Sequence, residues 1–408
     1  MRKDSGVALI SVVISTMLLS VLIGGLLSAA TRAKVINIRH IRNLDALQLA
    51  EAGVDFAIWE INYGGADFST GDGWSGTNPM TNTIDDFQDS SGNVYGDVIV
   101  YVYDHGSDFV TVMADASVDP GISGPPISRQ VYVKLEEHTI FDHALLAQDD
   151  IDVAGLGSID SYDSSLGPYG GTNIGEDGDI ITNSDDEQAI RVHGDVIVHG
   201  DATTGPGGTV AIIGTGGITG SIGDTAEEFI PPVVVPSGLQ GLISQGDINT
   251  TMTLYTGDYK FDSINLTSSK TLTLDGDINL YLVGDPSLRT LANAQIIVTN
   301  GAVNIYFDGD INLEGLGILN TSSSPENLAF YGTQSVTSVN LAGVGQCYGV
   351  FYAPSASFSI SGTSDVYGAI VGNDISVSGS ASIHYDKELG GGGGGPTIGY
   401  DPYVWSEH

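Results

Sequence analysis

Residues 1–63 follow a hydrophobic pattern that predicts one long helix. Residues 7–30 carry no charge over 24 positions. At about 1.5 Å per residue they span roughly 36 Å, enough to cross the core of a bilayer. Behind them, apolar residues recur every three or four positions, at Ile41, Leu44, Leu47, Ala50, Val54, Ile58 and Ile61. No proline interrupts this stretch and Gly64-Gly65 ends it. We expect a helix of roughly 55 residues, apolar all round at first and then amphipathic.

An alternating pattern follows the helix and predicts a small sheet. Residues 64–92 are polar and rich in Gly, Asn, Asp and Ser, so we expect a long loop there. Runs with a period of two then occupy residues 93–104, 108–118 and 127–137. Three such strands predict a small antiparallel sheet that packs on the amphipathic half of the helix.

From about residue 141 the pattern changes to short apolar runs separated by Gly-Asp turns. YGVFYAPSASFSISG (348–362) matches YGAIVGNDISVSG (367–379), and the two segments differ slightly in length. A period near 18 with small turn residues favours a parallel β-solenoid, with a sandwich as the alternative. We therefore predict an α+β chain: a long transmembrane and amphipathic helix, a small antiparallel head, and a large right-handed, mainly-β solenoid-like domain.

The C-terminal residues follow a glycine run, 390–395, that reads as a flexible break. Two interpretations remain open for the aromatic tail behind it. Tyr400, Tyr403 and Trp405 cap the last coil of the solenoid, or the tail is disordered. The PPVVVP segment (231–236) is expected to be an excursion between coils.

The charge distribution limits the possible partners. The formal net charge is −37, yet six of the 13 Lys and Arg residues lie in the first 42 positions. The remainder therefore carries seven cations against 49 acids, and it repels nucleic acid and anionic lipid headgroups. The basic flank at residues 32–42 would by itself favour a cytoplasmic position for the body. Long domains can nevertheless be translocated regardless of such charges. The single cysteine, Cys347, excludes an intramolecular disulfide.

The N-terminus resembles that of PilX-type minor pilins of type IV pilus assembly, and also that of the tip pseudopilins of type II secretion. The resemblance rests on a short basic leader ending in Gly6, on VALISVVIST behind it, and on ALQLAEAGVDFAIWEI (46–61). It implies that a prepilin peptidase cuts between Gly6 and Val7. Major pilins usually have Phe first and Glu fifth in the mature chain, whereas this chain has Val7 and Ser11. That departure fits a minor or tip subunit.

A second resemblance covers the C-terminal part. FDHALLAQDDIDVAG, GVFYAPSASFSISG and GAIVGNDISVSGSASIHYD are similar to the domain often found behind PilX-type N-termini. The expected organisation is then a leader, a pilin-type helix, a β head, a β-solenoid and a Gly-rich linker with tail, at residues 1–6, 7–63, 64–140, 141–389 and 390–408.

Candidate chemistry is sparse. His193 and His199 lie six residues apart, about 20 Å on one strand, and would share a metal only if the chain turned between them. The acidic stretch GEDGDIITNSDDE (175–187) offers possible calcium ligands but matches no EF-hand or nonapeptide repeat. These acids are Glu176, Asp177, Asp179, Asp185, Asp186 and Glu187. We predict no metal and no cofactor, and expect Cys347 to be buried and inert.

No nucleophile or metalloprotease motif occurs, and cations are too few for a lyase acting on anionic glycans. The sequence therefore predicts a non-enzymatic minor pilin-like component with a priming, tip or adhesion role. It would be single-pass in the inner membrane and then on the pilus or cell surface. Expected partners are other pilins, the assembly machinery, the prepilin peptidase and an extracellular surface or glycan. The alternative is a secreted or anchored β-helix that binds polysaccharide or hydrolyses glycosides.

Overall fold

The computed structural model describes residues 4–63, 73–88, 94–104, 109–122, 124–138, 140–343, 345–390 and 399–407. Two compact units divide the chain. The first combines Met1–Glu136 with Tyr400–His408, and the second is Glu137–Gly399. We call them the head unit and the stack unit and describe each by itself.

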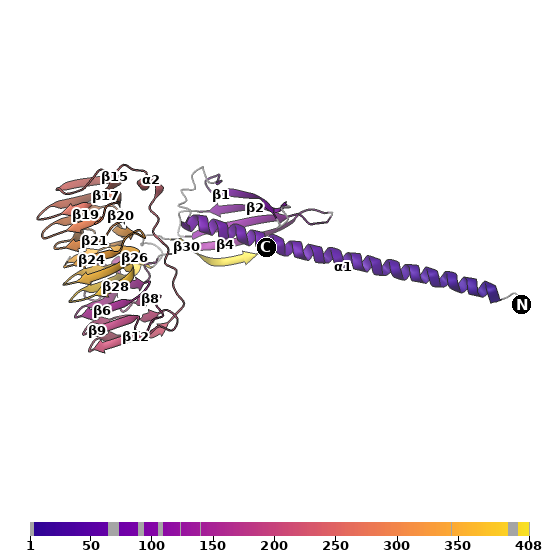
Figure 1. Cartoon of the computed structure of the whole chain (residues 1–408), viewed down its shortest axis with the longest axis horizontal. Helices are drawn as coiled ribbons and strands as arrows, with labels where there is room; N and C mark the ends of the chain where they lie inside the picture. The colour runs from indigo at the N-terminus through magenta and orange to yellow at the C-terminus, as the bar shows by residue number, and fades with distance from the viewer. Residues whose placement is uncertain are drawn as a thin grey trace. The chain divides into compact units, whose positions relative to one another are not determined.

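The head unit begins with α1 (Asp4–Tyr63), one unbroken helix of 60 residues. Figure 1 shows it as a single rod without a break at residues 30–40. It is long and apolar enough to cross a membrane by length and composition, as the sequence predicts. The absence of proline explains its continuity, because each interior residue can donate its backbone hydrogen bond.

A five-stranded sheet completes the head unit. Its strands are β1 (Met80–Gln88), β2 (Val94–Tyr103), β3 (Phe109–Val118), β4 (Ile127–His138) and β30 (Gly399–Glu407). They lie in the order β1-β2-β3-β4-β30, and β1 to β4 pair antiparallel with one another. The three predicted strands are confirmed. Residues 64–92 are not all loop, because β1 lies within them.

The C-terminal tail follows neither of the two interpretations that the sequence leaves open. Strand β30 lies beside β4 in the head sheet and does not cap the stack unit. Two hydrogen bonds hold it to α1: Asn62 Nδ2 donates to Tyr400 O at 3.1 Å, and Tyr400 N donates to Asn62 Oδ1 at 2.7 Å. Strand β4 would otherwise be an exposed edge, and pairing with β30 satisfies its backbone groups.

The stack unit consists of short strands and a few helical turns. Its first half holds β5 (Leu145–Ala147), β6 (Ile151–Gly155), β7 (Ser158–Tyr162), η1 (Ser164–Leu166), β8 (Ile180–Thr182), β9 (Ile190–Gly194), β10 (Ile197–Val198), β11 (Ala202–Thr204), β12 (Val210–Gly214), β13 (Gly217–Ile218), β14 (Ile222–Asp224) and α2 (Ser237–Gln240).

Its second half holds β15 (Met252–Phe261), β16 (Ile264–Leu266), β17 (Thr271–Leu282), β18 (Leu288–Thr290), β19 (Gln295–Asn300), β20 (Val303–Phe307), β21 (Ile311–Glu314), β22 (Ile318–Asn320), η2 (Pro325–Asn327), β23 (Leu328–Gly332), β24 (Ser338–Ala342), β25 (Gln346–Tyr348), β26 (Val350–Ser361), β27 (Asp365–Tyr367), β28 (Ile370–Val377), β29 (Ser382–Asp386) and η3 (Lys387–Leu389).

These strands form stacked tiers, each a turn of chain whose strands pair in parallel with those of the next tier. One tier, β5-β6-β7, pairs with β8, β9 and, through β7, with β10. The matched glycines Gly155, Gly194 and Gly214 stand at one corner of successive tiers, with φ of 115°, 79° and 131°. A residue with a Cβ rarely adopts such φ values, so the corner needs glycine.

The chain enters the stack in its middle rather than at an end. Strand β28 pairs with β26 on one side and with β5 and β6 on the other, and β29 pairs with both β27 and β7. The last tier therefore lies on the first. In Figure 1, β12 marks one end of the stack and β15 the other. Residues 225–251, which include the PPVVVP segment, connect these two ends, and we call them the strap.

The strap is tied to the side of the stack by specific bonds. The Tyr352 hydroxyl donates to Pro231 O, and Asn183 Nδ2 donates to Glu228 O at 2.7 Å. His143 Nε2 lies 3.1 Å from Glu228 Oε1. Burial lowers the pKa of His143, but this hydrogen bond and the nearby carboxylates outweigh burial and raise the pKa above its ordinary value.

The repeat seen in the sequence corresponds to paired tiers. Phe351 pairs with Ile370, and Phe358 pairs with Ile375, so the spacing between partners shortens along the two strands. A register shift between Ala353 and Ser357 accounts for the difference. The period near 18 does not hold elsewhere. Ile190 pairs with Val210, and Leu313 pairs with Leu341 at a still wider spacing, because loops of different length join similar strands.

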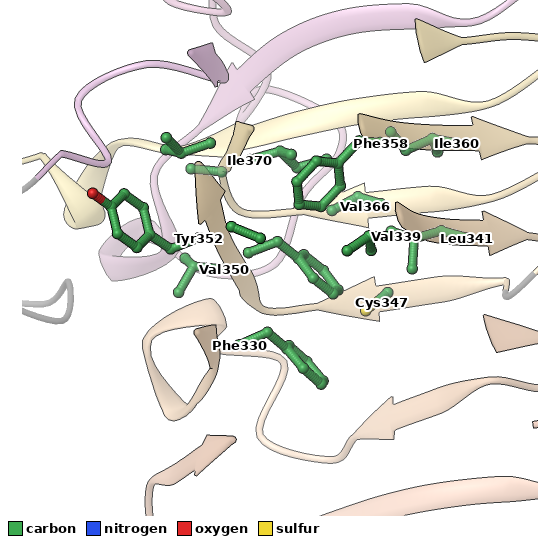
Figure 2. Packing of buried hydrophobic residues seen from close by; sticks show 14 of the residues in the cluster. Phe330, Val339, Leu341, Cys347, Val350, Tyr352, Phe358, Ile360, Val366 and Ile370 are labelled. Atoms are coloured by element: carbon green, nitrogen blue, oxygen red, sulfur yellow. The ribbon is translucent and has the colours of Figure 1, made fainter. Parts of the chain in front are cut away.

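The core of the stack is aliphatic and aromatic. Figure 2 shows Phe330, Cys347 and Phe358 among the side chains that fill the space between the strands. The rings of Phe330 and Phe351 lie 4.6 Å apart and almost parallel, one tier above the other. Such in-register stacking of like residues stabilises a parallel stack, since each buried large side chain contributes about 1.5–3 kcal/mol.

Candidate functional site

The predicted processing residues, Gly6 and Val7, lie in the first turns of α1. Behind them every large apolar side chain from Ile10 to Leu27 is between 45% and 74% exposed. Two hydroxyls in this half donate back to the helix backbone. Thr16 Oγ1 donates to Val13 O at 2.9 Å, and Ser20 Oγ donates to Thr16 O at 2.7 Å. The half of α1 before residue 30 is therefore an apolar surface without a partner in the described chain.

The second half of α1 packs on the head sheet. Its buried face consists of small and branched residues: Ala46, Leu49, Ala50, Val54 and Ala57. Gly53 lies close to the sheet, since a Cβ placed there would lie 2.8 Å from Val98 Cγ2 and 3.2 Å from Ala114 Cβ. The sequence pattern at residues 41–61 marks this face only in part, because Ala50 and Val54 are buried whereas Ile41 and Leu44 are 49% and 47% exposed.

Between these halves lies a basic segment, Arg32 to Arg42. Arg42 NH1 lies 3.2 Å from Asp45 Oδ2 one turn on. This ion pair is about one-third exposed on both sides, and it contributes little to stability. The basic segment separates the exposed apolar half of α1 from the packed half.

A buried polar cluster in the stack unit was not predicted. His384 Nδ1 lies 2.5 Å from Asp160 Oδ1, with both side chains at most 5% exposed. Tyr169 also donates its hydroxyl to Asp160 Oδ2 at 2.8 Å, and its ring lies 3.9 Å from the imidazole. Asp160 and His384 belong to β7 and β29, so the cluster fastens the first tier to the last.

This cluster has the composition of a catalytic dyad but not its setting. An acid beside a histidine needs access to substrate to transfer a proton. Here the tyrosine rings of Tyr169 and Tyr367 lie against the imidazole, at 3.9 and 4.7 Å, and cover it. Burial raises the pKa of the Tyr367 hydroxyl to about 12, so this tyrosine stays neutral. We assign the cluster a structural role.

The structure brings together a group of three aspartates, and the acidic stretch 175–187 contributes one of them. Asp186 joins Asp149 and Asp150, and one carboxylate oxygen from each lies within 4.8 Å of the others. Burial first, and then the charges of Asp374, Asp150 and Asp186, raise the pKa of Asp149. Arg191 already supplies a positive charge, with NH2 at 2.8 Å from Asp150 Oδ2. We therefore describe an ion-pair cluster and assign no cation to it.

The other candidates of the sequence lie apart from this group. His193 lies on β9, which ends at Gly194, whereas His199 directly follows β10, so a corner separates the two histidines. His193 Nε2 faces Asp152 Oδ1 at 3.6 Å. Cys347 is buried, and burial raises its thiol pKa to about 12, which makes it a poor nucleophile.

One cavity of the stack unit holds two carboxylates. It has a volume of about 490 Å³ and is open to solvent. Serines dominate its lining, with Glu326 and Glu388 at its wall, and the residues are Ser164, Ser165, Gly167, Pro168, Ser322, Ser323, Ser324, Glu326 and Glu388. Ser324 Oγ donates to Glu326 Oε1 at 3.2 Å. No lysine or arginine lines it, so a neutral polyol suits it better than an anionic sugar.

Comparison with known proteins gives limited information. A profile for a domain of unknown function (DUF7305) matches residues 232–391, less than half of the chain. A search of curated proteins finds no match. One similar solved structure is the competence-associated pilin ComZ from Thermus thermophilus, with 10% identity and a TM-score of 0.27, covering 90% of this chain and 97% of that one.

A second similar structure is an ice-binding protein from the Antarctic ascomycete Antarctomyces psychrotrophicus. It has 17% identity and a TM-score of 0.26, and the alignment covers 60% of this chain and 95% of that one. TM-scores of this size carry no argument about fold or function. The matched domain falls within the stack unit and carries no assigned activity.

Proposed function

We propose that the chain is a non-enzymatic, PilX-like minor pilin component of a type IV pilus or a related filament. The observation that carries this proposal is the helix α1, continuous from Asp4 to Tyr63, with one half exposed and apolar and the other half packed on a sheet. In this proposal the stack unit is a right-handed β-solenoid that the filament displays in a priming, tip or adhesion role.

The exposed half of α1 requires an apolar environment. Burying apolar surface is worth about 25 cal/mol per Å², and an uncovered helix of this composition would aggregate in water. The inner membrane supplies that environment before assembly, and the helices of other pilins supply it in the filament. Hydroxyls bonded back to the helix, such as Thr31 Oγ1 to Leu27 O at 2.8 Å, leave few polar atoms to desolvate.

The remaining partners and the location follow from this assignment. The assembly machinery and the prepilin peptidase act at the inner membrane, where the chain spans once. The bulk of the chain is then extracytoplasmic on the pilus or cell surface. There its acidic body, with a net charge of −37, would contact an extracellular surface or a glycan and would reject nucleic acid.

The mature N-terminus tests the proposal. Mass spectrometry of the chain purified from its own cells is expected to find Val7 as the first residue. Gly6→Leu should block cutting, since the peptidase acts after a glycine, and should leave the uncut chain in the inner-membrane fraction. Gly24→Leu is the matched control, because a Cβ at Gly24 meets nothing within 4 Å.

Two outcomes of the same measurement contradict the proposal. A product that begins near Ala29 would indicate a secreted protein, and an uncut chain in normal cells would indicate a plain membrane anchor. Either result would favour the second candidate, a β-helix that binds polysaccharide or hydrolyses glycosides. The cavity with Glu326 and Glu388 is the observation that favours this candidate.

A further inference from the structure

The two ends of the stack differ in how their core is covered. At the β15 end, Ile248 and Leu254 are 1% and 4% exposed, although they belong to the outermost tier of that end. The strap lies there, with Leu239 of α2 buried and Lys260 Nζ donating to Gln240 O at 2.7 Å. This end is closed by its own chain.

The opposite end, formed by β12, β13 and β14, is open. Ile212 pairs in register with Val192, and Ile222 pairs with Ala202. Val192 and Ala202 are at most 1% exposed, whereas Ile212 and Ile222 are 44% and 53% exposed. Because in-register residues of a parallel stack point the same way, these isoleucines are core residues with no tier above them. We call β12, β13 and β14 the open end.

The open end also presents strand edges without protection. Exposed edges are usually blunted by charges, proline or bulges. Here residues 202–223 contain no charged residue and eight glycines, and their one proline, Pro206, lies in the loop between β11 and β12 rather than on a strand edge. Gly217 and Gly223 have nothing within 4 Å of an added Cβ. Asp224, the last residue of β14, is the nearest acid in the sequence, and its carboxylate is engaged within the chain. Its Oδ2 accepts a hydrogen bond from Gly207 N at 3.0 Å.

Charge decides what kind of partner fits. A second copy of a chain with net charge −37 is repelled by most of this surface. The open end is an exception, because two uncharged tiers can meet without bringing carboxylates together. The β15 end lacks this property, since its outermost tier and the residues beside that tier carry charges: Asp247, Asp258, Lys260 and Asp262.

We propose that the open end binds the open end of a second copy, so that the exposed isoleucines of two stacks cover each other. A twofold axis brings the same patch of both copies together, and the free edges of β12, β13 and β14 are then covered by their equivalents. Closure by symmetry also ends the assembly at two copies, whereas an open edge would invite unlimited stacking. This contact is independent of α1 and of the proposed pilin role.

The mass of the full chain in detergent, measured by light scattering during gel filtration, tests this contact. The wild type is expected at twice the mass of one chain. Ile212→Glu combined with Ile222→Glu should halve that mass, because buried glutamates would face each other across the axis. Ile243→Glu is the matched control, since Ile243 is 89% exposed and lies outside the open end.

Cross-linking provides a second measurement in case the double variant does not fold. Ile222→Cys should form covalent dimers on mild oxidation, and Ile243→Cys should not. The native Cys347 does not interfere, because it is buried with a raised pKa. A monomeric wild type, an unchanged mass for the folded double variant, or equal cross-linking at Ile243→Cys would overturn the proposal.

Discussion

His384 on β29 links the last tier of the stack unit to the first, through Asp160 on β7. Its Nδ1 lies 2.5 Å from Asp160 Oδ1, and both side chains are buried at the junction of β29 and β7. Removing one partner of a buried pair leaves the other without compensation, which costs far more than the pair itself contributes. The junction also depends on the hydroxyl of Tyr169, which donates to the same carboxylate.

We predict that His384→Ala destabilises the stack unit by about 3–5 kcal/mol. The matched control is Lys387→Ala, three residues on, which breaks an ion pair to Asp177 that is about half exposed on both sides. Such a pair is worth at most about 1 kcal/mol. Urea unfolding followed by circular dichroism measures the difference, and equal midpoints for both variants would refute the structural role of the cluster.

No sequence pattern indicates this cluster. Asp160 and His384 are separated by 224 residues. Their meeting depends on the order of the tiers, which local patterns do not contain. The same holds for Asp149 and Asp150, which join Asp186 across two tiers. By contrast, the inert character of Cys347 could be predicted, because an apolar run on both sides implies burial.

At the scale of the element, α1 is the part that the sequence predicts best. Its helical periodicity is local, but the apolar positions of residues 41–61 mark the packed face only in part. That face also uses small residues such as Ala46 and Ala57, while Ile41 and Leu44 are exposed. Strands β2, β3 and β4 are equally clear, since they alternate. The sequence does not indicate strand β1, because MTNTIDDFQ is polar and has few apolar positions that could alternate.

The contact between α1 and the sheet depends on Gly53. An added Cβ would lie 2.8 Å from Val98 Cγ2, too close for a normal contact. We predict that Gly53→Ala destabilises the head unit by about 1–3 kcal/mol through overpacking, despite the better helix propensity of alanine.

Gly25→Ala provides the comparison for that variant. It lies in the same helix with nothing within 4 Å of the added atom, so it should be neutral or slightly stabilising. Thermal unfolding in detergent, followed by the near-ultraviolet signal of Trp59 and Trp74 in the head unit, measures both. A Gly53→Ala protein as stable as Gly25→Ala would show that the helix does not approach the sheet this closely.

In each unit, a strand from late in the sequence pairs with a strand from much earlier in the chain. The stack unit begins and ends at neighbouring tiers, because β28 and β29 pair with β5, β6 and β7. The head unit contains both ends of the chain, since β30 joins β4. Parallel pairing over long loops leaves no local signal, and neither does the pairing of β4 with a strand from the far end of the chain. The sequence therefore predicts many of the strands but not which strands lie side by side in a sheet.

The return of the C-terminus to the head sheet leads to the last prediction. Deleting residues 399–408 should expose the outer edge of β4 and remove the two bonds between Asn62 and Tyr400. Amides of β4 should then exchange with deuterium faster, because the hydrogen bonds to β30 that protect the outer edge of β4 are gone. Amides of β5 to β29 should keep their rates, since they belong to the other unit.

The variant Asn62→Ala separates the tether from the strand. It removes both side-chain bonds to Tyr400 but keeps β30, so it should raise exchange in β30 more than in β4. Hydrogen exchange with mass spectrometry on the full chain reports both regions at once. If the deletion left β4 fully protected, β30 would not be a pairing strand of the head sheet, and the aromatic tail would need a different partner. If exchange rose across β5 to β29 as well, the two units would not be independent, and the loss of one strand would propagate through the whole chain.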